Sequence, residues 1–281
     1  MRSYILLMLG NFTNWPSSSM MSSLKLTSIA MAETKVVILA AGKGTRMKAD
    51  VPKPLVKLAG KPMIEHLLER VTEAGIDSKP VVIVAPDSLE LFKQTLGNQV
   101  DFAVQSQQLG TGDAVKAARE ACGDAQHILI LYGDHPFIGA PVIHKLSRLA
   151  SKNLDALVML TSTVPNFEGD YAGFNAWSRI LRNSQGKIIG DKQFKDATPD
   201  ELKIHELNPC IFVFPAAWLW ASLEKLDNKN AGGEYYLTDL VKMAMEDRKE
   251  IVSETVDAME VIGINTPEEL KRAEHAYIKS I

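Results

Sequence analysis

The chain has 281 residues, of which 46% are hydrophobic and 23% charged, and this usage excludes disordered and collagen-like proteins. A formal net charge of −3 and a pI of about 6.1 leave no basic field that could hold a nucleic-acid backbone or an anionic membrane surface. The two cysteines, Cys122 and Cys210, lie far apart with no CxxC pair, so the sequence indicates neither a disulfide framework nor a zinc site and favours the cytoplasm.

Residues 1–32 differ in composition from the rest of the chain. They contain no acidic residue, and their apolar run at 4–9 falls short of the ~7 to 15 residues of a signal peptide. We expect a disordered leader or a start placed too far upstream, with a cleaved leader as the alternative. The longest later apolar run, 210–221, contains Pro215 and is far below the ~18 to 20 residues that span a bilayer, so we predict no transmembrane segment.

From residue 33 onward, short apolar runs alternate with amphipathic stretches. The expected elements are a strand at 35–39, a helix at 62–74, a strand at 80–85, a helix at 88–96, a strand at 99–104, a helix at 113–121, a strand at 128–132, a helix at 141–152 and a strand at 155–161. Strands separated by such helices form βαβ units, so we predict an α/β fold with a Rossmann-like, mostly parallel sheet and helices on both faces. Residues just after Leu39, Val104 and Tyr132 should then line one crevice, because ligands of such sheets bind beyond the carboxyl ends of the strands.

After Thr161 the texture changes to segments rich in Gly, Asn, Asp and Pro with short strands. This change indicates a substrate-binding lobe inserted into the fold rather than an independent domain. We therefore expect one domain over residues 33–281, preceded by the leader.

The loop at 40–53, AAGKGTRMKADVPK, carries the strongest chemical signal. Gly42 and Gly44 would let backbone N–H groups approach an anion, while Arg46 and Lys53 supply positive charge. A Walker loop is excluded because no Ser or Thr follows Lys43 directly. A dinucleotide fingerprint is excluded because no small residue stands at its third position and no acidic residue at the ribose-binding spacing. The order of residues favours a different phosphate-binding loop.

This loop resembles the signature of nucleotidyltransferases that join a nucleoside triphosphate to a sugar 1-phosphate or a related phosphate. Later segments resemble, in order, the uridylyltransferase domain of bifunctional bacterial N-acetylglucosamine-1-phosphate uridylyltransferases: QSQQLGTGDAV at 105–115, LYGDHPF at 131–137, KDAT at 195–198, GEYYLTD at 233–239 and GIN at 263–265. The resemblance implies the nucleotide-diphospho-sugar transferase type of fold, with a sugar-binding lobe. Related cytidylyl- and guanylyltransferases usually lack the LGTG and GEYYLTD segments, so the resemblance favours UTP.

The resemblance also implies roles for individual residues. The nucleotide would be held by backbone and side-chain groups of Ala40, Ala41, Gly42, Gly44, Gln105, Gly110 and Thr111. A glutamine amide and backbone groups can pair with the two carbonyls and one N–H of uracil. Asp134 and Asn265 match the ligands of Mg²⁺, the expected cofactor, which normally takes one or two protein oxygens and leaves its other positions to water and phosphates. Arg46 and Lys53 would be the catalytic cations, neutralising charge while a sugar 1-phosphate oxygen displaces pyrophosphate.

Departures from the family pattern cluster in the expected sugar pocket. Ser178, in NAWSRI at 175–180, replaces a glycine, and Gln193 replaces a glutamate two residues before the KDAT lysine. Asn208 is retained, but Pro209 and Cys210 follow it where the family has Thr-Gly. These changes leave the transfer of a uridylyl group better supported than the identity of the acceptor. The resemblance gives that acceptor as N-acetylglucosamine 1-phosphate or a relative of it. The alternatives left open are another sugar phosphate or nucleotide, or a catalytically weak nucleotide-binding protein.

Overall fold

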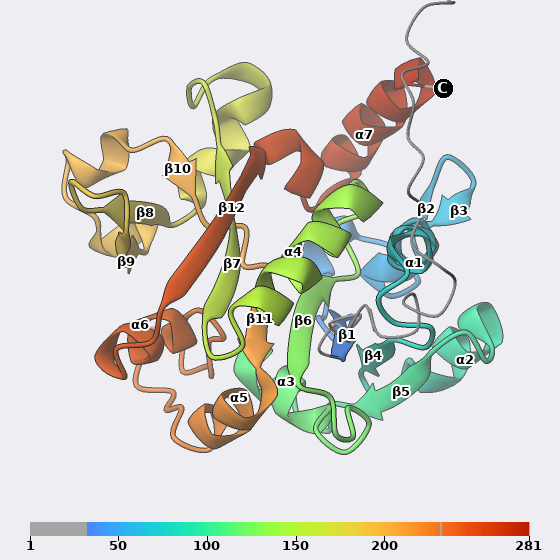
Figure 1. Ribbon diagram of the computed structural model, residues 1–281. Helices are drawn as coiled ribbons and strands as arrows, with labels where there is room; N and C mark the ends of the chain where they lie inside the picture. The colour runs from blue at the N-terminus through green and yellow to red at the C-terminus, as the bar shows by residue number, and fades with distance from the viewer. Residues whose placement is uncertain (1–32, 231, 281) are drawn as a thin grey trace, which may run out of the picture. The chain divides into compact units, whose positions relative to one another are not determined.

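Strand β1 (Thr34–Leu39) is the first element of the computed structural model, which describes residues 33–230 and 232–280 (Figure 1). The predicted leader, 1–32, lies outside the described residues. Three further strands join β1 in the order β5–β4–β1–β6, with β4 (Val81–Val84), β5 (Asp101–Val104) and β6 (His127–Tyr132) all parallel. Leu39 lies opposite both Ile83 and Tyr132, so the carboxyl ends of these strands align and the loops that follow them meet.

The second half of the sheet is mixed. Strand β11 (Phe212–Pro215) runs antiparallel between β6 and β7 (Leu157–Thr163), and β12 (Ile251–Asp257) pairs with β7 in parallel over its whole length. The apolar run noted at 210–221 thus holds a central strand and the start of a helix. The predicted α/β class with a mostly parallel sheet is confirmed, and β11 adds an antiparallel member that periodicity alone did not place.

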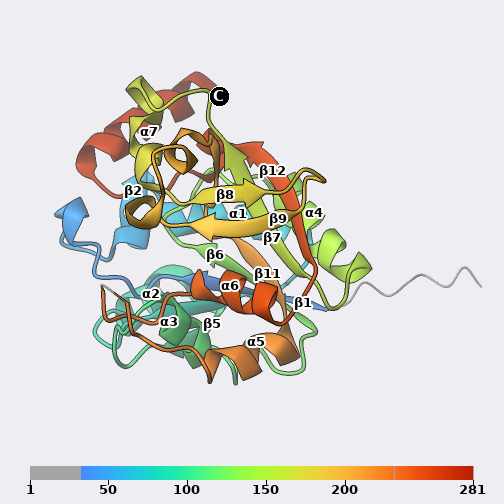
Figure 2. The ribbon, with the colours of Figure 1, turned by 90° about the vertical axis from the view of Figure 1, so that its left-hand side faces the viewer.

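Helices cover both faces of this sheet (Figure 2). On one face, α1 (Met63–Ala74), α2 (Leu89–Leu96) and α4 (Ala140–Lys152) share a core cluster with Val36 and Ile38. On the other face, α3 (Thr111–Ala117), α5 (Ala216–Leu223) and α6 (Asp239–Glu246) share a core cluster with Val37. Because side chains alternate along a strand, β1 is apolar on both sides and forms the centre of two cores. Helix α7 (Pro267–Ser280) follows the sheet. A hairpin of β2 (Lys57–Leu58) and β3 (Lys61–Pro62) precedes α1.

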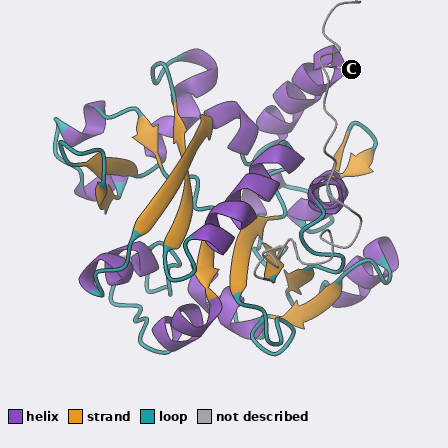
Figure 3. Cartoon of the chain, in the orientation of Figure 1, coloured by secondary structure: helices purple, strands orange, loops and turns teal. Residues whose placement is uncertain are grey.

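A lobe of short strands and loops is inserted between β7 and β11 (Figure 3). Its strands are β8 (Arg179–Arg182), β9 (Ile188–Lys192) and β10 (Glu206–Leu207), and its short helices are η3 (Gly169–Ala176), η4 (Phe194–Asp196) and η5 (Glu201–Lys203). The buried Arg179 guanidinium donates to carbonyls of Asn175, Trp177 and Leu202 and lies 4.5 Å from the Phe167 ring centroid. One arginine therefore ties together loops that have little apolar core of their own.

Element boundaries differ from the predicted ones by a few residues. Helix α3 spans Thr111–Ala117 instead of 113–121, because a run of turns begins at Ala118. In the part of the chain that the structure describes, no helix is both long and apolar enough to cross a membrane.

Candidate active site

The loop after β1 brings Lys53 back toward the strand end. Gly44 adopts φ +57°, a left-handed conformation that favours glycine. A Cβ atom built at Gly44 would lie only 2.8 Å from the Lys53 Cβ, so a larger residue would displace the lysine. Two short helices, η1 (Thr45–Met47) and η2 (Lys53–Leu55), carry Arg46 and Lys53. The loop sequence thus positions both cations predicted to be catalytic.

Four residues predicted from distant segments meet beside this loop. The Lys53 ammonium donates to the Asp134 carboxylate and, at 2.8 Å, to the Asn265 Oδ1. Arg46 donates to the same Asn265 oxygen at 3.1 Å. Asp134 follows β6, and Asn265 belongs to the segment between η6 (Ala258–Val261) and α7. One carboxylate oxygen, from Asp134, and one amide oxygen, from Asn265, therefore meet the two cations Lys53 and Arg46 at the carboxyl ends of the central strands.

The segment that carries Asn265 docks closely on Asp134. The Ile264 N–H donates to the Asp134 carbonyl at 3.0 Å. A Cβ atom at Gly263 would lie 2.8 Å from the His135 Nε2, so only glycine permits this approach. The Asn265 amide nitrogen donates to the Gly263 carbonyl at 3.1 Å, which turns its Oδ1 toward Lys53. Backbone contacts thus fix the orientation of the second oxygen.

The electrostatics of this cluster keep Asp134 ionised. Burial alone would raise the pKa of the Asp134 carboxyl, but the His135 imidazole and the Lys53 ammonium together hold it below its ordinary value. Burial lowers the pKa of His135, whose ring stacks on Tyr132 with centroids 5.3 Å apart. His135 packs beside Asp134 with its Nε2 3.9 Å from the nearer carboxylate oxygen.

The donor set suits a hard divalent cation. Asp134 and Asn265 contribute oxygen atoms only, and both oxygens already converge on one positively charged group, the Lys53 ammonium. Mg²⁺ prefers such oxygens and usually takes few from the protein. Among the described residues, no group of three or more His, Cys, Asp or Glu side chains could form a metal cage. The residues present thus fit a metal ion shared between the protein and a phosphate ligand.

A second group of predicted residues surrounds Gln105, which follows β5. The buried Gln105 amide nitrogen donates to the Gly110 carbonyl at 3.0 Å and to the Asp113 carboxylate at 2.8 Å. Both amide hydrogens are used in this way, so its carbonyl Oε1 is the atom left to accept from an N–H of a ligand. Gln108 donates to the Ala41 carbonyl and so joins this loop to the loop after β1.

The Gly110–Thr111–Gly112 segment packs on the Tyr235 segment. The Gly112 N–H donates to the Tyr235 carbonyl at 2.8 Å, and the Tyr235 N–H donates to the Leu109 carbonyl at 2.8 Å. A Cβ atom at Gly110 would lie 2.6 Å from the Tyr235 carbonyl oxygen, and Gly110 adopts φ +123°. The Thr111 hydroxyl accepts from the Leu237 N–H at 2.9 Å. Two motifs that are far apart in the sequence therefore form one wall.

The residues predicted to bind sugar lie in the lobe, but they differ in their exposure to solvent. Ser178 and Asn208 are buried, while Gln193 is exposed where β9 leads into η4. The Asn208 amide donates to Asp191 at 2.7 Å and accepts from the Cys210 N–H at 2.7 Å. Cys210 adopts φ +62°, the left-handed region that favours the glycine of the family pattern. Cys210 thus holds a backbone conformation that a glycine would adopt with less strain.

Sequence reasoning missed three residues at these sites. Gln108 and Tyr235 lie inside motifs that were singled out, but their roles depend on backbone contacts that only the fold reveals. Asp191 stands in a short strand of ordinary composition. The only signal in the sequence was its own acidic side chain, two positions before Gln193.

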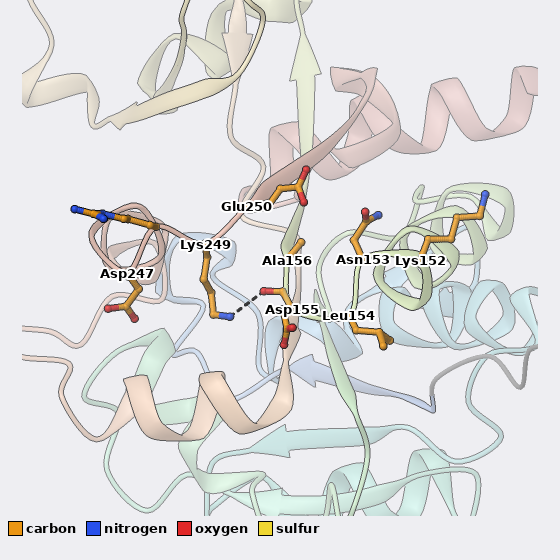
Figure 4. A pocket seen from close by; sticks show the side chains of 9 residues that line it. Lys152, Asn153, Leu154, Asp155, Ala156, Asp247, Lys249 and Glu250 are labelled. Atoms are coloured by element: carbon orange, nitrogen blue, oxygen red, sulfur yellow. Dashed lines mark hydrogen bonds between the residues drawn. The ribbon is translucent and has the colours of Figure 1, made fainter.

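A cavity of about 540 Å³ lies at the other edge of the sheet, where β7 and β12 begin (Figure 4). Charged side chains of both signs line it, and the Lys249 ammonium donates to the Asp155 carbonyl at 2.8 Å. Ligands of such sheets bind at the carboxyl ends of the parallel strands. This cavity is therefore separate from the cluster around Lys53 and Asp134.

Known proteins resemble this chain over most of its length. Residues 36–243 match the family described as MobA-like NTP transferase domain. The chain is 37% identical over 235 residues to the bifunctional protein GlmU of Lactobacillus helveticus, covering 83% of this chain and 49% of that protein. It is 38% identical over 240 residues to the GlmU of Caldicellulosiruptor saccharolyticus, covering 85% of this chain and 50% of that protein. The chain thus spans about half the length of the curated relatives it matches.

Two solved structures share the fold. A CMP:2-keto-3-deoxy-manno-octonic acid synthetase in complex with CTP gives a TM-score of 0.68 at 18% identity, covering 89% of this chain and 100% of that one. A Bacillus anthracis protein described as a glucose-1-phosphate thymidylyltransferase gives a TM-score of 0.69 at 17% identity, covering 88% of this chain and 96% of that one. At this identity the likeness confirms the predicted nucleotide-diphospho-sugar transferase fold.

Proposed function

The chain belongs to the MobA-like NTP transferase domain family and is a nucleotidyltransferase of the sugar-phosphate type, and on that premise we propose that it transfers a uridylyl group from UTP to a sugar 1-phosphate with release of pyrophosphate. The observation that carries the proposal is the convergence of Lys53 and Arg46 on the oxygens of Asp134 and Asn265. That arrangement suits a reaction in which several phosphate charges must be brought together and neutralised.

The transfer is a direct displacement at phosphorus. An anionic oxygen of the sugar 1-phosphate forms a bond to the α-phosphorus of UTP, while the bond from that phosphorus to the bridging oxygen breaks and pyrophosphate leaves with the electron pair. No general base is required, because the attacking phosphate is already ionised. Lys53 and Arg46 hold positive charge beside the reacting phosphates and stabilise negative charge as it moves to the leaving group.

We propose Mg²⁺ as the cofactor, held by Asp134 and Asn265. When bound, it would neutralise and orient the phosphates of the triphosphate. The low pKa of Asp134 keeps its carboxylate available to a cation at neutral pH. The hydrogen bond from Asn265 to the Gly263 carbonyl presents the amide oxygen to the same place.

The hydrogen bonds of Gln105 support a preference for UTP. Its amide hydrogens are engaged by Gly110 and Asp113, so its carbonyl oxygen is the acceptor left for a base. Uracil presents an N–H at its ring N3, whereas cytosine presents an unprotonated acceptor there, which would oppose another acceptor. The backbone at Ala40 to Gly42 is then the surface on which the base would lie, since Gln108 joins the two loops at Ala41.

For the acceptor we propose N-acetylglucosamine 1-phosphate or a related sugar 1-phosphate, bound by the lobe with Ser178, Gln193 and Asn208. Support comes from the identity to the bifunctional GlmU proteins and from the left-handed backbone of Cys210, where the family pattern has glycine. The cytoplasm stays the expected location.

The deciding experiment is pyrophosphate release from the purified chain, with each of UTP, CTP, GTP and dTTP against a panel of sugar 1-phosphates, with Mg²⁺ and with EDTA. Turnover only with UTP and Mg²⁺ supports the proposal. Efficient turnover with another nucleotide, or in EDTA, would contradict it.

A further inference from the structure

The backbone of Asn265 is held by a carboxylate that does not belong to the cluster around Lys53. Glu269, in the first turn of α7, accepts a hydrogen bond at Oε2 from the Asn265 N–H, at 2.6 Å. The same oxygen accepts from the Thr266 N–H at 3.1 Å. In return, the Glu269 N–H donates to the Thr266 hydroxyl at 3.2 Å. Glu269 thus binds two successive N–H groups at the point where the chain enters the helix.

Part of this arrangement is ordinary helix capping. In a capping box, a Thr before the helix and a Glu three residues later bind each other's backbone N–H groups, as Thr266 and Glu269 do. Such a box requires no contact with the residue before the Thr. The bond to Asn265 therefore exceeds what capping needs, and it is the shorter of the two bonds that Oε2 accepts. The carboxylate restrains Asn265 itself, and not only the start of α7.

The N–H groups of Asn265 have partners that leave its Oδ1 for the cations. Its backbone N–H binds Glu269, and its side-chain nitrogen donates to the Gly263 carbonyl at 3.1 Å. A rotation of the side chain would break the bond to Gly263, and a shift of the backbone would break the bond to Glu269. The Oδ1 atom is therefore held where it accepts from Lys53 and Arg46.

Glu269 stands on a helix that is anchored to the phosphate-binding loop. Leu270 and Ala273, which follow it on α7, belong to the same apolar cluster as Met47 of that loop. Met47 lies next to one of the two proposed catalytic cations in the sequence. Groups on rigid elements hold their partners more precisely than groups on loops. A carboxylate on α7 is therefore well placed to fix Asn265 relative to the loop.

We propose that Glu269 is a positioning residue for the transfer reaction: through the Asn265 backbone it keeps the Asn265 Oδ1 where the two cations and the proposed Mg²⁺ meet. Without the Glu269 carboxylate that oxygen is free to move, which weakens metal binding and slows turnover. Residues that orient a metal ligand typically contribute about 10- to 100-fold to metal affinity or activity. This inference rests on the proposed metal site and on the proposed transfer.

The test compares Glu269→Ala with variants of its two neighbours in the full chain. Thr266→Ala removes the other half of the capping box but keeps the Glu269 carboxylate. Glu268→Ala removes an exposed carboxylate from the same helical turn. Mn²⁺ serves as the probe, because it prefers the same oxygen ligands as Mg²⁺ and its binding can be followed by electron paramagnetic resonance. A non-hydrolysable UTP analogue is present throughout.

Mn²⁺ affinity should fall about 10-fold or more in Glu269→Ala and stay unchanged in Thr266→Ala and Glu268→Ala. The Mg²⁺ concentration needed for half-maximal turnover should rise in the same variant. Glu269→Gln keeps an oxygen acceptor and should recover most of the affinity. Melting temperature should fall in both Glu269→Ala and Thr266→Ala, because each loses part of the cap. An equal loss of Mn²⁺ affinity in these two variants would assign Glu269 to capping alone and overturn the proposal.

A double-mutant cycle shows whether Glu269 acts through Asn265. If it does, the double variant should bind Mn²⁺ no more weakly than Asn265→Ala alone, whereas additive losses would overturn the proposal. If the cycle is non-additive but no UTP is turned over, the proposed reaction fails and the role of Glu269 holds. If turnover occurs and Glu269→Ala matches its controls, the proposed function stands and the role of Glu269 fails. Unchanged Mn²⁺ affinity in Asn265→Ala would remove the metal site and this inference together.

Discussion

The Lys53 ammonium and the Asp134 carboxylate stand 81 positions apart in the chain and form an ion pair at the carboxyl ends of the central strands. Both side chains are largely buried, at 18% and 12% exposure, so solvent screens this pair less than a surface pair. The same lysine also binds the Asn265 oxygen, which means that one cation holds both proposed metal ligands in place before any substrate binds.

Asp134→Ala should abolish turnover in Mg²⁺, by about 1000-fold or more in kcat, because it removes the one carboxylate among the proposed ligands. The fold should persist, because Asp134 lies in a loop and Lys53 keeps its bond to Asn265. Pyrophosphate release and thermal melting measure the two effects. Asp87→Ala, at an exposed aspartate after β4, serves as control. Near-normal turnover of Asp134→Ala would remove the metal assignment.

Lys53→Ala and Arg46→Ala should each lower kcat by more than they raise the KM for UTP, because their charge matters most as negative charge moves to pyrophosphate. We expect kcat to fall further in Lys53→Ala than in Arg46→Ala. Lys53 contacts both Asp134 and Asn265, whereas the exposed Arg46 contacts only Asn265. Steady-state kinetics with varied UTP give both constants. Lys57→Ala, at an exposed lysine of β2, is the control. A rise in KM alone would make the two residues ground-state anchors.

Gly44→Ala should lower both stability and kcat, since a methyl group would meet the Lys53 Cβ at 2.8 Å in a left-handed backbone. Gly123→Ala is the matched control, because Gly123 has a similar φ of +53° but open space around it. Each variant should lose about 1 to 2 kcal/mol of unfolding free energy from backbone strain. Urea unfolding and turnover distinguish them: equal losses of kcat in both variants would show that contact with Lys53 is not the cause.

Stability should fall on acidification because of His127, at the start of β6. Burial lowers the pKa of its imidazole, and its Nδ1 has no hydrogen-bond partner among the described residues. The unfolded chain, with a His pKa of about 6.5, therefore binds more protons than the folded chain, so stability rises with pH. The stabilising contribution is present above about pH 6.5 and is lost as the pH falls through the lowered folded pKa.

The measurement is the urea midpoint between pH 5 and 7.5 for the unmodified chain and for His127→Gln, which keeps an N–H donor for the Leu154 carbonyl. The slope of unfolding free energy against pH should be smaller in the variant, by up to about 1.4 kcal/mol per pH unit. Identical slopes would mean that His127 does not titrate with unfolding.

Much of the fold could be predicted because β1, β4, β5 and β6 are short apolar runs separated by amphipathic helices. Their aligned carboxyl ends also bring the loops after Leu39, Val104 and Tyr132 together, as the contacts of Gln108 with Ala41 and of Gly133 with Leu39 confirm. The position of β11 in the sheet could not be predicted, because an apolar run does not specify the two strands between which it will pair. The hydrogen bond from the Asn208 amide to Asp191 joins residues 17 positions apart, and hydrophobic periodicity does not predict such a contact.

The approach of Asn265 to Lys53 spans 212 positions of the chain. During synthesis, the parallel half of the sheet and its phosphate-binding loop leave the ribosome long before this asparagine does. A nascent chain could thus fold around the nucleotide loop and still lack half of its proposed cation site. The onset of turnover should therefore depend on the late docking of the 263–265 segment, which also brings Ile264 into the core cluster of Met47.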